Sequence, residues 1–226
     1  MSAPVSGASA ARVRVAVVDD DTLIREGLRT LATSLEVVDV YPTAEDLLAD
    51  QPTVDVVLLD LNLLGTGRLG GLQGARAVAA ISAVPRAVLI YTNERRREVL
   101  VGCLSAGARG VVHKAEPISA VEEAVHTIAA GGVVITDALA GLAELVNRSG
   151  QLPQLTPRER EVLRGRARGE TFASIGARLY ITPKTAQEYM ASTSGKFAEF
   201  LRTHSAADLE HRLGFTPGDL LDWGTQ

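Results

Sequence analysis

The chain of 226 residues places acidic, hydroxyl and ammonium side chains directly after apolar segments of its first half. Residues 54–59 form a nearly continuous apolar run that ends at Asp60. Such a run is typical of a strand buried on both faces of a parallel sheet, and ligands bind where the carboxyl ends of such strands meet. A carboxylate at that edge can attack phosphorus and form an acyl phosphate. Considered alone, however, Asp60 is better explained as a residue that ends the strand or caps a turn.

The polar groups that follow the other apolar segments favour the interpretation of Asp60 as a nucleophile over that of a strand end. Asp19 and Asp20 follow the first segment, Thr92 follows a later one, and Lys114 follows the last. Neighbouring carboxylates repel one another unless a cation lies among them, and a set of oxygen ligands favours Mg²⁺. The metal and the lysine would neutralise a transferring phosphoryl group, to which the threonine hydroxyl could bond. Together with Asp60, these residues predict a magnesium-dependent phosphoacceptor site.

Alternating strands and helices are expected to position these groups. Short apolar and β-branched runs predict strands, whereas apolar residues spaced three and four apart predict helices. Strands are expected at 13–18, 36–41, 54–59, 86–91 and 110–113, and helices at 24–35, after Thr43, and at 72–81, 94–106 and 117–130. The alternation predicts an α/β fold with a doubly wound, flavodoxin-like sheet of five parallel strands. All the groups named above would lie at one edge of this sheet.

A small all-α domain is expected from about residue 154. Thr156 precedes a proline and, three residues later, a glutamate, which is a signature of a helix start. Thr171 and Thr182 are expected to cap two further helices, joined by a tight connection at Tyr180-Ile181. Short helices in this arrangement describe a helix-turn-helix. Four later apolar residues could form a fourth helix for packing or dimerisation, namely Phe200, Leu201, Leu209 and Leu213.

The third of these helices would lie in the major groove of DNA. Lys184 and Thr185 suit contacts with phosphates, while Gln187 could pair with adenine and Glu188 could accept a hydrogen bond from cytosine. Ser192 completes the face that this helix would expose. The simpler alternative is a polar face that meets only water. Glu188 favours that alternative, because carboxylates and phosphates repel one another.

Motifs in both halves resemble one known family. Residues 12–130 look like the receiver domain of two-component response regulators, most closely in the segment AGARGVVHK at 106–114. The segments TPREREVL at 156–163 and IGARLYITPKTA at 175–186 resemble the LuxR-type domain of the NarL/FixJ regulators. This resemblance implies five parts: a tail at 1–11, a receiver at 12–130, a linker with a short helix at 131–153, a helix-turn-helix domain at 154–213 and a C-terminal extension at 214–226.

The resemblance also assigns roles to residues. It implies that Asp60 is phosphorylated, that Asp19 and Asp20 bind Mg²⁺, and that Thr92 and Lys114 are the switch hydroxyl and the site lysine. It further implies a backbone carbonyl ligand from Asn62. The expected protein is a transcription regulator rather than an enzyme, a homodimer that binds promoter DNA. Its phosphoryl group would come from a sensor histidine kinase or a small phosphodonor.

Two positions depart from the family pattern. Leu64 stands where the family usually has a proline, and Val111 stands where it usually has an aromatic residue that moves with the switch hydroxyl. The loop at 65–71 looks about three residues longer than usual, judged by family spacing. These departures keep open a regulator whose DNA binding does not depend on phosphorylation.

Two further alternatives belong to other classes of protein. A phosphatase resembling the haloacid dehalogenases would use Asp19 or Asp21 as nucleophile, but Leu23 stands where that chemistry requires Thr or Val. It would also leave the helix-turn-helix unexplained. The other alternative is a protein-interaction module whose helix-turn-helix no longer binds DNA, which Glu188 and the nearly neutral second half favour.

Composition narrows the class of protein. The formal net charge is −4 and, from residue 151 onward, ten Lys and Arg stand against nine Asp and Glu, a difference of +1. Any phosphate-binding surface must therefore be local, and the DNA affinity of one protomer modest. Cys103 is the only cysteine, which excludes an intrachain disulfide and a cysteine metal cluster. No signal peptide or membrane segment is expected, which suggests a cytoplasmic protein.

Overall fold

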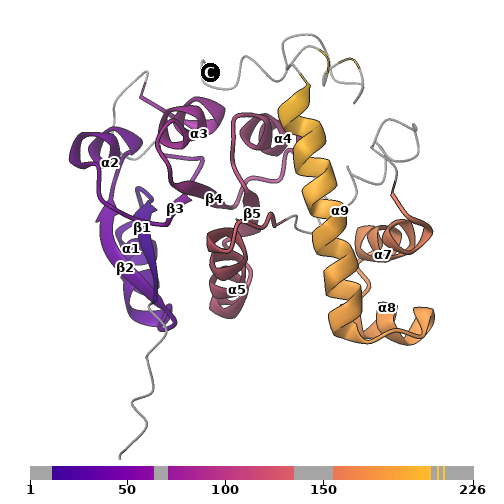
Figure 1. The fold of residues 1–226 in the computed structure, drawn as a ribbon. Coiled ribbons are helices and arrows are strands. Elements are labelled where there is room, and N and C mark those ends of the chain that lie inside the picture. Colours follow the sequence, from indigo (N-terminus) through magenta and orange to yellow (C-terminus); the bar gives the residue numbers. More distant parts are fainter. Residues whose placement is uncertain (1–11, 64–70, 135–154, 205–207, 209–210, 212–226) are drawn as a thin grey trace, which may run out of the picture.

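The computed structural model describes residues 12–63, 71–134, 155–204, 208 and 211. The expected tail, the position of Leu64 with most of its loop, most of the linker and the C-terminal extension lie outside these residues. A sheet domain and a helical domain are present, in chain order (Figure 1). Among the described helices, none is both long and apolar enough to cross a membrane.

The first domain is built on five parallel strands. They are β1 Val13–Val18, β2 Leu35–Tyr41, β3 Val56–Leu59, β4 Ala87–Thr92 and β5 Gly110–His113, in the spatial order β2-β1-β3-β4-β5. In the register of the three inner strands, Val17 pairs with Leu58 and Leu58 with Leu89. All four residues of β3 are buried, as expected of a central strand covered on both faces. The predicted doubly wound parallel sheet is confirmed.

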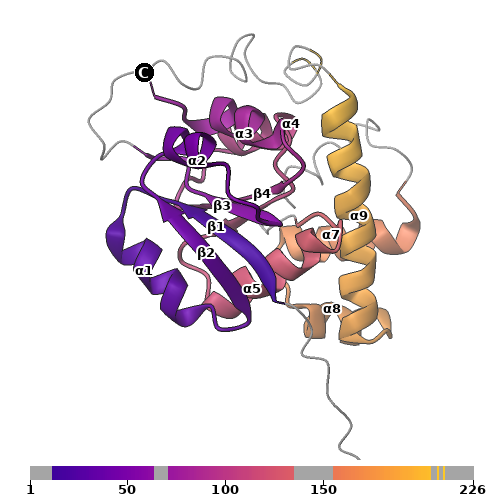
Figure 2. The ribbon, with the colours of Figure 1, turned by 60° about the vertical axis from the view of Figure 1, so that its left-hand side comes forward.

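Helices cover both faces of this sheet (Figures 1 and 2). α1 Thr22–Leu31 and α5 Ile118–Ala129 pack on one face, and α2 Ala44–Asp50, α3 Gly74–Ser82 and α4 Arg97–Ser105 pack on the other. Each face has its own apolar core, because the buried side chains of every strand alternate between the two sides. The sheet is therefore held rigidly between two layers, and its carboxyl edge is left as the open side.

Two element boundaries of the first domain differ from the prediction by three residues or more. Helical spacing assigns Leu35 to the first helix, but α1 ends at Leu31 and Leu35 pairs with Val13 in the sheet. Leu35 is buried in the core beneath α1, so its apolar side chain fits either interpretation. The helix predicted from Glu94 begins at Arg97 instead. The Glu94 carboxylate accepts the backbone N–H groups of Arg95 and Arg96, and these hydrogen bonds hold the two residues before the helix in position.

The second domain consists of three described helices, α7 Pro157–Ala167, α8 Phe172–Leu179 and α9 Pro183–Thr203. The predicted threonine caps are all present. In each case the hydroxyl of Thr156, Thr171 or Thr182 accepts a backbone N–H of the first turn. These caps fix the first residue of each helix. The tight α8–α9 connection of the predicted helix-turn-helix results from them.

α9 is longer than predicted. The apolar pattern predicts that Phe200 and Leu201 belong to a separate fourth helix, but they lie inside α9, because no glycine or proline after Gly195 interrupts this stretch. Leu209 and Leu213 lie outside the described residues. The C-terminal half of α9 packs beside α4 of the first domain, and buried residues such as Leu100 and Phe200 belong to one continuous apolar core (Figures 1 and 2). α9 therefore belongs to the helical domain and also packs against the first domain.

Candidate functional site

Asp60 lies one residue beyond β3 and is almost completely buried, with 5% of its surface exposed. Its Oδ1 accepts the backbone N–H of Leu61 at 2.7 Å and the hydroxyl of Thr92 at 2.8 Å. Its Oδ2 accepts a hydrogen bond from Lys114 Nζ at 2.8 Å. Thr92 ends β4 and Lys114 follows β5, so three neighbouring strands supply this constellation. The parallel register brings the three strand ends to the same edge.

Lys114 also neutralises a second carboxylate. Its Nζ lies 2.7 Å from Asp19 Oδ2, and the side chains are 10% and 1% exposed. Burial alone would lower the pKa of Lys114, but the bonds and charges of Asp19 and Asp60 outweigh it, so the pKa of the ammonium is raised. Burial raises the pKa of Asp19, and the ammonium opposes this effect. Lys114 is therefore held in its charged form between two acids.

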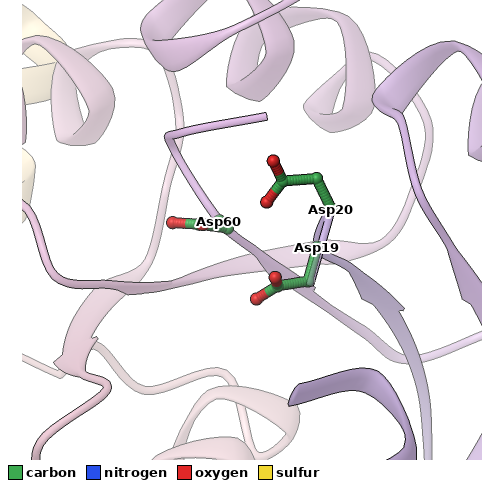
Figure 3. A group of neighbouring side chains, drawn as sticks. All are labelled: Asp19, Asp20 and Asp60. Atoms are coloured by element: carbon green, nitrogen blue, oxygen red, sulfur yellow. The ribbon is translucent and has the colours of Figure 1, made fainter. Parts of the chain in front are cut away.

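Three carboxylates could hold a metal ion at this edge. Oxygen atoms of Asp19, Asp20 and Asp60 lie within 4.8 Å of one another. Figure 3 shows the Asp20 carboxylate directed toward Asp60, with the Asp19 carboxylate on the same side of the two strand ends. Asp19 Oδ2 is buried and pairs with the Lys114 ammonium at 2.7 Å, so a metal ion would share this carboxylate with the lysine. Three carboxylates that offer hard oxygen donors so close together fit Mg²⁺, which prefers oxygen ligands.

The site opens into a cavity of about 530 Å³, lined by Asp20, Asp60, Asn62, Thr92 and Lys114 among others. The cavity is therefore wide enough to admit a phosphoryl donor to the predicted nucleophile. Four of the five residues predicted for the acceptor and metal site line this cavity together with Asn62. The fifth, Asp19, lies beside Asp20 and Asp60.

Two charged residues of the cavity were not predicted, Glu94 and Arg96. Arg96 Nε donates to both carboxylate oxygens of Glu94 at 3.0 Å. The guanidinium hydrogen bonds lower the pKa of Glu94 to about 2. The only sequence signal for this pair is its position shortly after Thr92, at the start of the stretch predicted as a helix. Glu94 and Arg96 place a second charge pair beside the acceptor.

Val111, which stands where the family usually has an aromatic residue, belongs to the apolar core. Val111 is fully buried in β5, level with Ile90 of β4. The side chain cannot leave this position without opening the apolar core on the α2–α4 side of the sheet. The structure thus gives Val111 a packing role.

The predicted DNA-contacting residues lie on the N-terminal half of α9, but they are not equivalent. Lys184, Gln187 and Glu188 are exposed. Thr185 is half-buried, and its N–H and hydroxyl both bond to the hydroxyl of the capping residue Thr182, at 3.0 Å and 2.9 Å. Ser192 is exposed but donates a hydrogen bond to another helix. The face that is freely available is therefore narrower than predicted.

The partner of Ser192 is Glu159 of α7, which is 4% exposed. Its carboxylate also accepts the Thr156 N–H at 2.7 Å and two contacts from Lys196 Nζ at 2.7 and 2.9 Å. Burial would raise the pKa of Glu159, but the bonds from Lys196, Ser192 and Thr156 outweigh it and lower the pKa to about 2. These contacts join α7 to α9, and the sequence does not reveal the ones with Ser192 and Lys196, because those residues are far from Glu159 in the chain.

Both domains match known protein families. Residues 15–126 match the model of the response regulator receiver domain, and residues 153–210 match that of the bacterial regulatory proteins of the luxR family. The two matched segments coincide with the sheet domain and the helical domain.

Relatives match along most of the chain. A nitrate/nitrite response regulator protein homolog of Haemophilus influenzae is 32% identical over 200 residues, which cover 86% of this chain and 92% of the relative. A probable transcriptional regulatory protein NarL of Mycobacterium tuberculosis is 32% identical over 184 residues, 79% of this chain and 85% of the relative.

A solved structure has the same fold. RcsB from Salmonella enterica serovar Typhimurium, bound to a promoter in the presence of phosphomimetic BeF3−, superposes with a TM-score of 0.53 at 20% identity. The superposition covers 90% of this chain and 98% of RcsB. The similarity at this level of identity concerns the fold.

Proposed function

The chain belongs to the response regulators that join a receiver domain to a luxR-family DNA-binding domain, and we propose that phosphorylation of Asp60 controls its activity as a transcriptional regulator. The observation that carries this proposal is the set of contacts around Asp60. Lys114 and Thr92 bond to separate oxygens of its carboxylate, and two further acids lie beside it. No observation favours a phosphatase, since the two family matches account for both halves of the chain.

In the proposed reaction, an Asp60 oxygen attacks phosphorus and displaces the leaving group of the donor, which forms an acyl phosphate. Asp19, Asp20 and Asp60 would hold Mg²⁺ together with the Asn62 carbonyl, and the ion would neutralise the transferring group. Lys114, 2.8 Å from Asp60 Oδ2, can follow a phosphoryl oxygen that takes the place of its present acceptor. The Thr92 hydroxyl can likewise exchange Asp60 Oδ1 for a phosphoryl oxygen. The donor would be a sensor histidine kinase or a small phosphodonor.

The DNA-binding half of the proposal rests on α9. Lys184 would contact a phosphate, and Gln187 and Glu188 would meet base edges in the major groove. RcsB, which has the same fold, has been seen as dimers bound to DNA, and this agrees with our proposal of a homodimer that binds two half-sites. We also propose a cytoplasmic location, because the proposed DNA-binding function requires access to promoter DNA.

Phosphorylation can be tested on the full chain with Mg²⁺ and acetyl phosphate. Intact-mass spectrometry should show the addition of one phosphoryl group to the wild type and none to Asp60→Asn. Asp55→Asn is the matched control, because Asp55 is an exposed carboxylate at the opposite end of the same strand. A phosphorylated Asp60→Asn variant would refute the assignment of the acceptor.

A second candidate is a regulator that binds DNA without phosphorylation, which the buried Val111 favours because valine cannot report the state of Thr92 by moving a ring. DNA affinity should be compared for the wild type with and without acetyl phosphate. An unchanged affinity and an unchanged dimer fraction, despite complete phosphorylation, would favour this second candidate. A rise in either would favour the first.

A further inference from the structure

Tyr180, in the turn between α8 and α9, combines two unusual properties. Its surface is 96% exposed, more than that of any other large apolar residue in the described part of the chain. Its φ angle is +57°, in the left-handed region that disfavours residues with a Cβ atom and suits glycine or asparagine better. A bulky side chain at such a position is a reason to look for a function.

Hydrogen bonds and close packing within the turn hold the backbone of Tyr180 in this left-handed conformation. Its N–H donates to Gly176 O as the cap of α8, and the N–H of Ile181 donates to the same carbonyl at 3.0 Å. A Cβ atom on Gly176 would lie 2.8 Å from Ile181 O and 3.2 Å from Pro183 N, so the two helices approach as closely as glycine allows. The backbone of the turn is thus rigid, and the phenol ring is held out in solvent without packing that would offset its conformation.

The ring stands beside the surface that the proposed function assigns to DNA. Two residues later, Thr182 caps α9, and exposed Lys184 lies in the first turn of that helix. The turn is at the end of α9 opposite to α4, where no other part of the described chain covers it (Figures 1 and 2). When a recognition helix lies in the major groove, residues next to its N-terminus are close to a phosphate chain at the edge of the groove.

We propose that the hydroxyl of Tyr180 donates a hydrogen bond to a DNA phosphate beside the groove that α9 enters. This inference rests on the proposed DNA-binding function and adds a contact residue to it. The bases of a duplex are stacked on one another, so the ring has no free base face to meet. A phosphate oxygen is the acceptor that a phenol O–H would find at this position. Such a contact is neutral, and it supports affinity in a domain with little net positive charge.

The neutral character of the contact gives a specific test. A lysine that neutralises a phosphate contributes about 0.9 to the slope of log K against log salt, whereas a phenol contributes nothing to it. Tyr180→Phe should therefore weaken binding about three- to tenfold for each bound protomer, the range of one typical hydrogen bond, at an unchanged salt slope. Lys184→Ala should weaken binding and also reduce the slope by about one for each bound protomer.

Binding would be measured by fluorescence anisotropy at several salt concentrations. The probes are a duplex selected from a random-sequence pool by the wild-type chain and an unrelated duplex. Tyr180→Phe should weaken binding to both, because a phosphate contact carries no sequence information. Tyr180→Asn should weaken binding as well but keep or raise the melting temperature, because asparagine tolerates the left-handed conformation. A loss of affinity in that variant could then not be attributed to a damaged fold.

Wild-type affinity in both Tyr180 variants would overturn the inference. Unchanged DNA binding combined with reduced transcription in a reconstituted system would also overturn it, since Tyr180 would then contact a protein of the transcription machinery. If the wild-type chain itself bound no duplex, the proposed function would fail and the inference with it. That result is distinguishable from a failure at Tyr180 alone, where the wild type binds and the variants match it.

Discussion

Replacing Lys196 by Met would leave the Glu159 carboxylate buried without its main cation. Glu159 is 4% exposed and receives two contacts from Lys196 Nζ at 2.7 and 2.9 Å. Removing one partner of a buried ion pair typically costs about 3–5 kcal/mol. Because Ser192 and the Thr156 N–H still bond to the carboxylate, we expect the unfolding free energy to fall by about 3 kcal/mol, at the lower end of this range.

The pKa of Glu159 leads to the same magnitude. It falls from 4.5 to about 2 in the folded chain. At about 1.4 kcal/mol for each tenfold change in proton affinity, this difference corresponds to about 3 kcal/mol. Because the folded pKa is depressed, this stability is present above pH 4.5 and is lost as the pH falls toward 2. In Lys196→Met, the largest of the contributions that lower the pKa of Glu159 is removed while burial still raises it, so the dependence on pH should flatten.

The assay is hydrogen exchange of α7 and α9 amides in urea, read by mass spectrometry on the full chain at pH 7 and near pH 4. Lys184→Met is the matched control, since Lys184 is an exposed lysine of the same helix. The double variant Glu159→Gln with Lys196→Met should recover part of the loss, because no charge is then left buried. Equal protection of α7 in Lys196→Met and Lys184→Met at pH 7 would refute the reasoning.

Four other outcomes are expected. Gly176→Ala should lower the unfolding free energy of the helical domain by about 1–3 kcal/mol and weaken DNA binding, because its Cβ would meet Ile181 O at 2.8 Å. Gly195→Ala, with nothing within 4 Å of its Cβ, should raise the melting temperature instead. Burial raises the pKa of the Cys103 thiol to about 12, so iodoacetamide at pH 8 should label it only in urea; rapid labelling of the native chain would contradict this. Asp20→Asn should raise the Mg²⁺ concentration needed for phosphorylation by acetyl phosphate at least tenfold, and an unchanged requirement would remove Asp20 from the metal site.

The strand-end residues could be predicted because their positions follow from local pattern alone. An apolar run that ends in a polar residue marks the edge of a sheet, and this places Asp19, Asp60, Thr92 and Lys114 together once the strands are parallel. The helix starts were predictable for a similar reason, since a threonine cap such as Thr156 acts within one turn.

What the sequence could not reveal depends on contacts between distant segments or on competing patterns. Glu159 and Lys196 are 37 positions apart, and their contact exists only after α7 and α9 pack together. Leu35 satisfied the spacing of α1 and the first position of β2 equally, and pairing with the sheet decided between them. The continuation of α9 through Phe200 needed the absence of a breaker to be weighed above the change in apolar pattern.

The continuity of α9 has a mechanical consequence. Its 21 residues span about 30 Å at 1.5 Å per residue, from the end that we propose to contact DNA to the part that packs on α4. A straight helix of that length acts as a lever arm, and a tilt of about ten degrees at its seat would move the far end by about 5 Å. That distance exceeds the rise of about 3.4 Å between base pairs, so a small adjustment of the receiver surface would be enough to shift the end of α9 that we propose to contact DNA by more than one base pair.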